Sequence, residues 1–211
     1  MTEPIVASVV MPERGVFLVR CPEGMPLDDC RKGIMVVVSL DYGMDAGELV
    51  SAAPYNPSVH GARMPGYRLE RFVTDPDRTR IAENAELAVS MKIAFEKTVA
   101  PDVPDLLVFA ARLSFGRSRL FIRFVSERRR PDLSRALAEM KRLFGVSVNA
   151  WQMGPRDEVV CMGALGPCGR VCCCASWQKR FPSRLAAPEG ANPACVNGVC
   201  GRFKCCWSFE D

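Results

Sequence analysis

The chain has 211 residues, of which 48% are hydrophobic and 25% are charged, a balance typical of a folded protein with one large or two small domains. No apolar run approaches the roughly 18 residues of a membrane span, and the first residues lack the basic region of a signal peptide, so we expect a cytoplasmic protein without membrane insertion. The net charge of +4 is uneven: residues 1–116 carry −4, residues 117–150 carry +6 and residues 151–211 carry +2.

Residues 1–74 are predicted to form a small β domain. Short runs rich in Val, Ile and Leu, such as IVASVVM and IMVVVSL, are separated by segments rich in Gly, Pro and Asp. Several short strands at this spacing are typical of a small barrel or an antiparallel sheet. The Pro, Gly and Asn content of segment 53–66 predicts an exposed loop, where we expect His60, the only histidine, to be solvated rather than a metal ligand.

Residues 75–153 predict the order helix, strand, strand, helix, strand. Asp75 or Asp77 is expected to cap the first helix, and apolar residues at roughly helical spacing follow as far as Phe95. The runs LLVFAARLSF and RLFIRFV predict a hairpin that turns at Gly116, and VSVNAWQM alternates like a third strand. This order favours a sheet covered by helices on one face, and hence an α+β fold for the chain.

The segment PDLSRALAEMKRLFG predicts the second helix of this unit. It is expected to begin near Pro131 and to end at Gly145, because glycine is common just after a helix. From their spacing, we expect its buried face to consist of Leu133, Leu137, Met140, Leu143 and Phe144.

Residues 154–211 form a cysteine-rich segment with no long periodic run, so we expect little regular structure there. Nine of the eleven cysteines lie between Cys161 and Cys206. A segment this short, without a long periodic apolar run, has little core of its own, so we expect a bound group to organise it. Without a signal peptide, this cysteine density indicates metal or redox chemistry rather than disulfides.

One motif, CGRxxCC, occurs twice at an offset of 32 residues, which predicts two similar local backbones that each present three thiols. Glycine after the first cysteine permits a tight turn, and Arg170 and Arg202 favour thiolates and balance their charge. The predicted metal ligands are Cys168, Cys173, Cys174, Cys200, Cys205 and Cys206. The reserve ligands outside the repeat are Cys161, Cys172 and Cys195.

The motif leaves three interpretations open. All-sulfur ligation fits an iron–sulfur cluster or a four-cysteine zinc site, and the third possibility is unligated regulatory or buried thiols. The chain has no C-x-x-C and no histidine near the repeat, which weakens the zinc-ribbon and thioredoxin interpretations. No P-loop, G-x-S-x-G or H-E-x-x-H motif occurs either, so we expect a non-catalytic protein.

Basic residues beside aromatic ones make nucleic acid a further candidate partner. Arg128, Arg129 and Arg130 end the run RFVSERRR, and Arg202 and Lys204 lie among the aromatic residues of the second motif. Such groups contact phosphates and stack on bases, although packing of the aromatic rings beneath a metal-bound loop also explains the pattern.

The C-terminal motifs resemble those of the bacterial RicT/YaaT family. The matching elements are GPRDE at Gly154–Glu158, the first cysteine motif within Gly163–Cys174 and the second within Gly198–Glu210. The upstream helix–hairpin–helix–strand run and the N-terminal β region also follow the family, so the resemblance covers nearly the whole chain. This chain differs at Cys172, where the family usually has an apolar residue, and in its additional thiols.

The resemblance implies a non-catalytic regulatory subunit. Family members act with two small helical proteins, RicA and RicF, in a complex that carries 4Fe–4S clusters and modulates mRNA processing by RNase Y, with effects on sporulation and biofilm formation. By position, the family's ligands fall among the six cysteines of the repeat. Two other classes of function remain: a zinc-stabilised nucleic-acid-binding module that contacts RNA, and a thiol redox protein.

Overall fold

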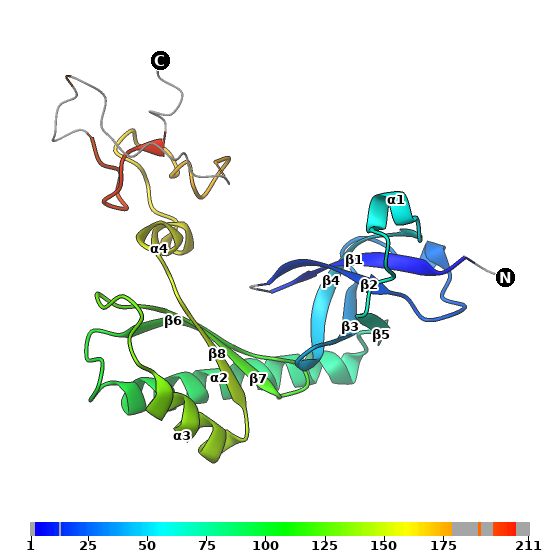
Figure 1. The fold of residues 1–211 in the computed structure, drawn as a ribbon, viewed down its shortest axis with the longest axis horizontal. Helices are drawn as coiled ribbons and strands as arrows, with labels where there is room; N and C mark the ends of the chain where they lie inside the picture. The colour runs from blue at the N-terminus through cyan, green and yellow to red at the C-terminus, as the bar shows by residue number, and fades with distance from the viewer. Residues whose placement is uncertain (1–2, 13, 179–189, 191–195, 206–211) are drawn as a thin grey trace.

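The structure is a computed structural model that describes residues 3–12, 14–178, 190 and 196–205. It confirms the predicted α+β fold: a closed barrel of strands is followed by a three-stranded sheet with two helices and then by cysteine-rich loops (Figure 1). Among the residues described, no helix combines the length and the apolar character needed to cross a bilayer.

The N-terminal strands close into the expected small barrel, in the order β1-β2-β5-β3-β4. The strands are β1 (Ile5–Met11), β2 (Gly15–Arg20), β3 (Met35–Leu40), β4 (Gly43–Pro54) and β5 (Arg68–Phe72). A short 3-10 turn, Leu27–Asp29, lies between β2 and β3. Along β3, Val36 and Val38 belong to the barrel core, whereas Val37 between them belongs to a second cluster with Phe115, as the two-residue period of a strand requires.

Strand β4 approaches β1 so closely that only glycine fits at position 47. A Cβ atom at Gly47 would lie 2.5 Å from the Met11 sulfur, 2.6 Å from a Val9 methyl carbon and 2.7 Å from the Val10 carbonyl oxygen. The β1–β4 register also shifts between Ser8 and Val9, which marks a bulge beside this contact. The closed shape of the barrel therefore depends on glycine, which has no side chain, at position 47.

Segment 53–66 is more ordered than its composition predicted. Strand β4 extends to Pro54, and a four-residue helix, α1 (Pro57–His60), follows it. Asn56 caps this helix by accepting a hydrogen bond from the Ser58 nitrogen at 2.9 Å. His60 accepts a hydrogen bond from the Asn56 nitrogen at 2.9 Å through Nδ1, and its ring stacks on Tyr55. The expectation of a plain loop was wrong because side-chain capping makes a short helix possible here.

The second unit has the predicted α-β-β-α-β order. Its elements are α2 (Asp75–Val99), β6 (Leu107–Leu113), β7 (Arg119–Val125), α3 (Ser134–Phe144) and β8 (Ser147–Gln152). The sheet order is β6-β7-β8, with β7 antiparallel to β6 and parallel to β8. Helices α2 and α3 pack together on one face of this sheet (Figure 1).

The beginning of α2 differs from the sequence prediction. Thr74, rather than Asp75 or Asp77, is the N-cap residue. The Asp77 carboxylate accepts hydrogen bonds from the Thr74 nitrogen at 2.8 Å and from its hydroxyl at 2.7 Å, and it also pairs with Arg71. These donors hold the pKa of Asp77 well below its usual range, Arg71 having the largest effect. Asp77 thus completes a capping box from inside the helix.

The buried face of α3 is narrower than predicted. Ala136 and Met140 are buried, and Leu133 and Leu137 pack beside them. Leu143 and Phe144, which were expected on the same face, are 49% and 38% exposed. Both residues continue the apolar spacing of the helix into its last turn, but this spacing does not show how far the surface that packs against the helix extends.

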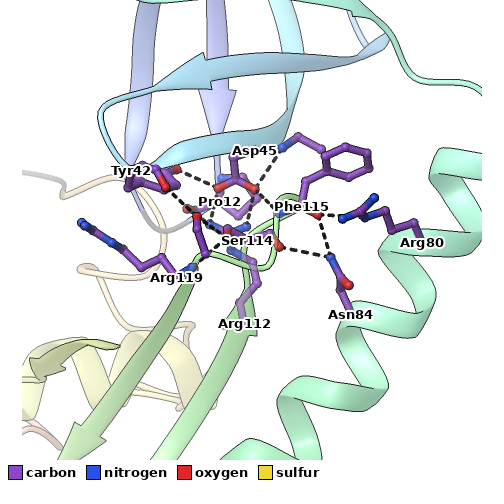
Figure 2. A network of polar contacts seen from close by, with 11 residues as sticks. Pro12, Tyr42, Asp45, Arg80, Asn84, Arg112, Ser114, Phe115 and Arg119 are labelled. Carbon is purple, nitrogen blue, oxygen red and sulfur yellow. Dashed lines mark hydrogen bonds and ion pairs between the residues drawn. The ribbon is translucent and has the colours of Figure 1, made fainter. Parts of the chain in front are cut away.

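Buried Asp45, near the start of β4, joins the barrel to the β6–β7 hairpin (Figure 2). Its carboxylate accepts two hydrogen bonds from the Arg112 guanidinium, both at 3.0 Å, and one from the Phe115 nitrogen at 3.1 Å. On the barrel side it accepts the Tyr42 hydroxyl at 2.7 Å and the Ala46 nitrogen at 2.9 Å. A carboxylate that is 1% exposed needs this number of donors, so the network ties the hairpin to the barrel.

Helix α2 holds the other side of the same hairpin loop (Figure 2). Asn84, which is buried, donates to the carbonyl oxygens of Ser114 at 3.1 Å and Phe115 at 3.3 Å. Arg80 donates to the Phe115 carbonyl at 3.1 Å, and Arg117 donates to the Asn84 side-chain oxygen at 2.6 Å. The loop therefore connects the barrel, the sheet and α2 at one point.

We predict that Asp45→Ala lowers the free energy of unfolding by about 3 kcal/mol, because it removes the buried carboxylate that pairs with the Arg112 guanidinium and accepts the Phe115 N–H. Urea denaturation followed by circular dichroism measures this. The control is Asp41→Ala, which removes an exposed ion pair with Arg14 and should cost about 0.5 kcal/mol or less. An Asp45→Ala chain as stable as the control would contradict the role of Asp45.

Candidate metal centre

The first cysteine motif forms a tight loop closed by backbone hydrogen bonds. The Gly166 nitrogen donates to the Arg170 carbonyl at 2.8 Å, and the Gly169 nitrogen donates to the Gly166 carbonyl at 2.9 Å. Leu165 and Val171 flank the loop as an antiparallel bridge. Gly169 has a φ of 73°, in the left-handed region that glycine adopts without a steric penalty, which explains the glycine after the first cysteine.

The second motif repeats this loop in detail. The Gly198 nitrogen donates to the Arg202 carbonyl at 2.8 Å, and the Gly201 nitrogen donates to the Gly198 carbonyl at 2.9 Å. Asn197 and Phe203 form the flanking bridge, and Gly201 has a φ of 70°. The sequence repeat is therefore a structural repeat: within the described part of both motifs, the glycines and arginines take part in equivalent backbone hydrogen bonds.

Cysteines from both loops line one pocket of about 350 Å³. Val159 of helix α4 (Pro155–Met162) contributes to its wall, together with the apolar residues Val171, Val199 and Phe203. No histidine or carboxylate is among the described residues that line it. The cysteines that line it are Cys168, Cys172, Cys173, Cys174, Cys200 and Cys205.

The thiols of the two loops influence one another electrostatically. Burial raises the pKa of Cys172, and nearby thiols, including those of Cys174 and Cys200, raise it further. Burial also raises the pKa of Cys205, while the positive charge of Arg156 offsets part of that increase. The second loop thus acts on a thiol of the first, as expected of donors that share one site.

Helix α4 supports the second loop and was not predicted, since residues 154–211 were expected to be irregular. Gly154 is its N-cap residue, and the Asp157 carboxylate accepts a hydrogen bond from the Gly154 nitrogen at 3.0 Å. Arg156, which is buried, donates to the Phe203 carbonyl at 3.4 Å. A helix of eight residues is too short to show a helical periodicity in the sequence. The GPRDE string nevertheless contains the N-cap glycine, the proline of the first turn and Arg156.

The remaining predicted residues lie away from the pocket walls or outside the described part. Cys161 is exposed on α4 and does not line the pocket, and Arg170 and Arg202 are exposed at equivalent positions of the two loops. Lys204 lines the pocket beside Cys205. Two predicted ligands, Cys195 and Cys206, fall outside the described residues.

The donor chemistry of the pocket fits a soft metal centre. All of its candidate ligands are sulfur, which suits an iron–sulfur cluster or zinc. Within residues 3–12, 14–178, 190 and 196–205, however, no three Cys, His, Asp or Glu side chains are arranged to hold a metal ion.

A second pair of neighbouring thiols lies in the barrel. Burial raises the pKa of Cys21 to about 12, and the adjacent Cys30 thiol contributes to this increase. Cys30 itself donates a hydrogen bond to the Pro26 carbonyl at 3.7 Å. Nothing in the spacing of these two residues indicated the contact, because the chain between them folds back through a 3-10 turn.

We predict that iodoacetamide modifies Cys168 much faster than Cys21 in the reduced, chelator-treated protein near neutral pH. Cys168 is exposed, whereas Cys21 is buried and its raised pKa leaves very little reactive thiolate. Mass spectrometry of peptides at successive times measures the two rates, and the urea-denatured chain is the control in which the difference should largely disappear. Equal rates in the folded protein would contradict the buried position of Cys21.

The chain has one informative similarity to known proteins. No family model matches it, and no solved structure matches it. Among curated proteins it is similar to the Stage 0 sporulation protein YaaT of Bacillus subtilis (strain 168), at 27% identity over 171 residues. The aligned region covers 78% of this chain and 61% of the relative, so the chain spans less than two thirds of that protein's length.

Proposed function

We propose that this chain is a member of the RicT/YaaT family, as its duplicated motif and its curated relative support, and that it is a non-catalytic regulatory subunit whose two CGRxxCC loops hold one metal centre. The name of the relative assigns that protein to stage 0 of sporulation, so the coarser form of the proposal is a sporulation-related regulator. The finer form is a cytoplasmic accessory subunit that carries a 4Fe–4S cluster and adjusts RNase Y-dependent mRNA processing together with RicA-like and RicF-like proteins.

The observation that carries the metal proposal is that two equivalent loops line one pocket, in which the candidate ligands among the described residues are all thiols. Each loop contributes its first cysteine, Cys168 or Cys200, from the same turn with a left-handed glycine. Unligated thiols require neither the repeated backbone nor a shared pocket. A soft metal requires the shared pocket, because several sulfur ligands have to face a single centre, and the repeated backbone supplies equivalent thiols from two loops.

The surrounding residues suit such a centre. Apolar side chains such as Val171, Val199 and Phe203 line the pocket, and burial raises the pKa of Cys205 while the positive charge of Arg156 offsets part of that increase. An iron–sulfur cluster held there would make the fold of the two loops depend on iron and on oxidation. The chain would then act through the surface that these two loops form, which would be present when the cluster is bound and absent when the cluster is lost.

Metal analysis of protein purified without oxygen tests the proposal. We predict iron and acid-labile sulfide in the wild type, and loss of most of both in Cys168→Ser and in Cys200→Ser, because the two positions are equivalent in the repeat. The matched control is Cys30→Ser, a barrel cysteine, which should retain the wild-type metal content. Unchanged metal content in both loop variants would show that these cysteines are not ligands.

The same experiment separates the rival functions. Stoichiometric zinc without sulfide would favour the zinc-stabilised nucleic-acid-binding module over the iron–sulfur subunit. A metal-free chain that reduces a disulfide substrate, and loses this activity in Cys173→Ser, would favour the thiol redox protein. Either result would overturn the proposed cluster.

The repeat also predicts which thiols of the CCC run bind metal. Cys172 corresponds, at the offset of 32, to Lys204, and the nitrogens of these two residues donate to Ala164 and Val196 carbonyls, both at 3.1 Å. The second loop thus has no thiol at this position. We predict that Cys172→Ser retains most of the metal and that Cys173→Ser loses it, as measured by iron content under anaerobic conditions. Equal losses would mean that Cys172 is a ligand.

A further inference from the structure

The face of the three-stranded sheet opposite α2 and α3 carries basic and aromatic side chains. Alternation along β7 places Arg119, Phe121 and Arg123 on this face, while Leu120 and Ile122 belong to the core beneath the helices. In the β7–β8 register, Trp151 lies directly beside Arg123. Arg123 and the exposed Trp151 are therefore neighbours on this face, whereas the Phe121 ring is buried against the barrel.

A groove of about 410 Å³ lies over this face, between the sheet and the β1–β2 hairpin of the barrel. The hairpin contributes Arg14, whose guanidinium lies over the rings of Phe17 at 5.1 Å and Tyr42 at 4.9 Å. In the overall view this hairpin extends from the barrel toward the sheet (Figure 1). The groove is lined by Arg14, Phe121, Ile122, Arg123, Asn149 and Trp151.

The groove has positive charge that the described protein leaves largely unneutralised. None of the described residues that line it is acidic. Arg14 has an exposed partner, Asp41, at 3.3 Å, but within the described ranges Arg123 makes neither an ion pair nor a side-chain hydrogen bond. Arg119, next on the same face, lies 5.2 Å from the centre of the Tyr42 ring. An anion would supply the counter-charges that the protein does not.

Trp151 indicates what kind of anion fits. Trp151 is 62% exposed at the position paired with Arg123 in the β7–β8 register, although burial of so large an aromatic ring would be favourable. A flat exposed ring next to a cation is suited to the face of a nucleic-acid base and its phosphate. An acidic peptide would use the arginines but would leave the indole without a partner.

The basic loop predicted from sequence extends the same surface. Gln152 holds this loop against the end of β8: its amide nitrogen donates to the carbonyls of Ser126 at 3.1 Å and Arg128 at 2.7 Å, and its oxygen accepts from the Arg130 nitrogen at 3.0 Å. The loop is thereby fixed one residue beyond Trp151, and Arg129 in it is exposed. Positive charge thus continues from Arg119 past Trp151 to the loop.

From this arrangement we infer that the groove binds single-stranded RNA, with Trp151 stacked on a base and Arg14 and Arg123 on adjacent phosphates. Single strands fit because the face of a base is accessible to the indole only when it is not stacked in a duplex. The choice of RNA over DNA rests on the proposed function in mRNA processing, whereas the groove itself does not depend on the cysteine loops.

Fluorescence anisotropy of the full chain with a labelled, unstructured RNA of about 12 nucleotides tests the inference. We expect Arg123→Ala to weaken binding and to reduce the slope of log affinity against log salt by roughly 0.7, the value for one phosphate contact on a single strand. Trp151→Ala should weaken binding about tenfold with an unchanged slope, and Trp151→Phe should restore most of the affinity, because a base stacks on either ring.

The controls separate the groove from charge in general. Arg142→Ala removes an exposed arginine from α3, on the opposite side of the sheet, and should bind RNA as the wild type does. Circular dichroism confirms that each variant is folded. Wild-type chain that does not bind the RNA, groove variants that bind as tightly as the wild type, or equal binding of duplex and single strand would each overturn the inference.

Two further outcomes concern the acidic peptide and the metal centre. Groove variants that lose binding to a polyglutamate peptide, in a chain that does not bind RNA, would show that the surface takes an acidic protein instead. RNA binding that depends on Trp151 in a chain without any metal would support this inference while refuting the proposed cluster. Failure of one hypothesis is therefore distinguishable from failure of the other.

Discussion

The ion pair between buried Asp45 and Arg112 is the contact on which the arrangement of barrel and sheet depends. A carboxylate with almost no exposure to water is stable only where donors surround it, and two of these donors come from the β6–β7 hairpin. Arg112 also lies 4.6 Å from the centre of the Phe121 ring, a sheet residue that packs into the barrel core against Tyr42. Polar and apolar contacts thus fix one relative position of the two units.

That position has a functional consequence at the groove. Arg14 and the residues of β7 and β8 are more than 100 positions apart in the sequence, and they share a surface only because the barrel is held against the sheet. Loss of the Asp45 network would therefore separate the two walls of the groove as well as destabilise the fold. The cysteine loops do not depend on this contact, because α4 and the second loop are joined by Arg156.

The candidate metal centre was more predictable than the sheet face, for a physical reason. The CGRxxCC repeat encodes a loop whose hydrogen bonds lie within five residues, so an identical string folds to an identical turn at Gly169 and Gly201. By contrast, α4 is too short to show a periodicity, the contact between Cys21 and Cys30 depends on a 3-10 turn that their spacing does not reveal, and the exposure of Leu143 depends on neighbours distant in the chain. Local patterns contain no information about where those neighbours lie.

By itself, the sequence determined the α+β order of elements, the small barrel, the duplicated thiol loops and the resemblance to the RicT/YaaT family. These features follow from short-range patterns: the two-residue period of strands, the spacing of apolar residues in helices and the turn preference of glycine. Only the tertiary structure decided that cysteines of both loops face one pocket, that Asp45 is buried between the units, and that Arg14 and Trp151 border one groove. Each of these is a contact between distant segments, which packing of the whole chain creates and no single segment specifies.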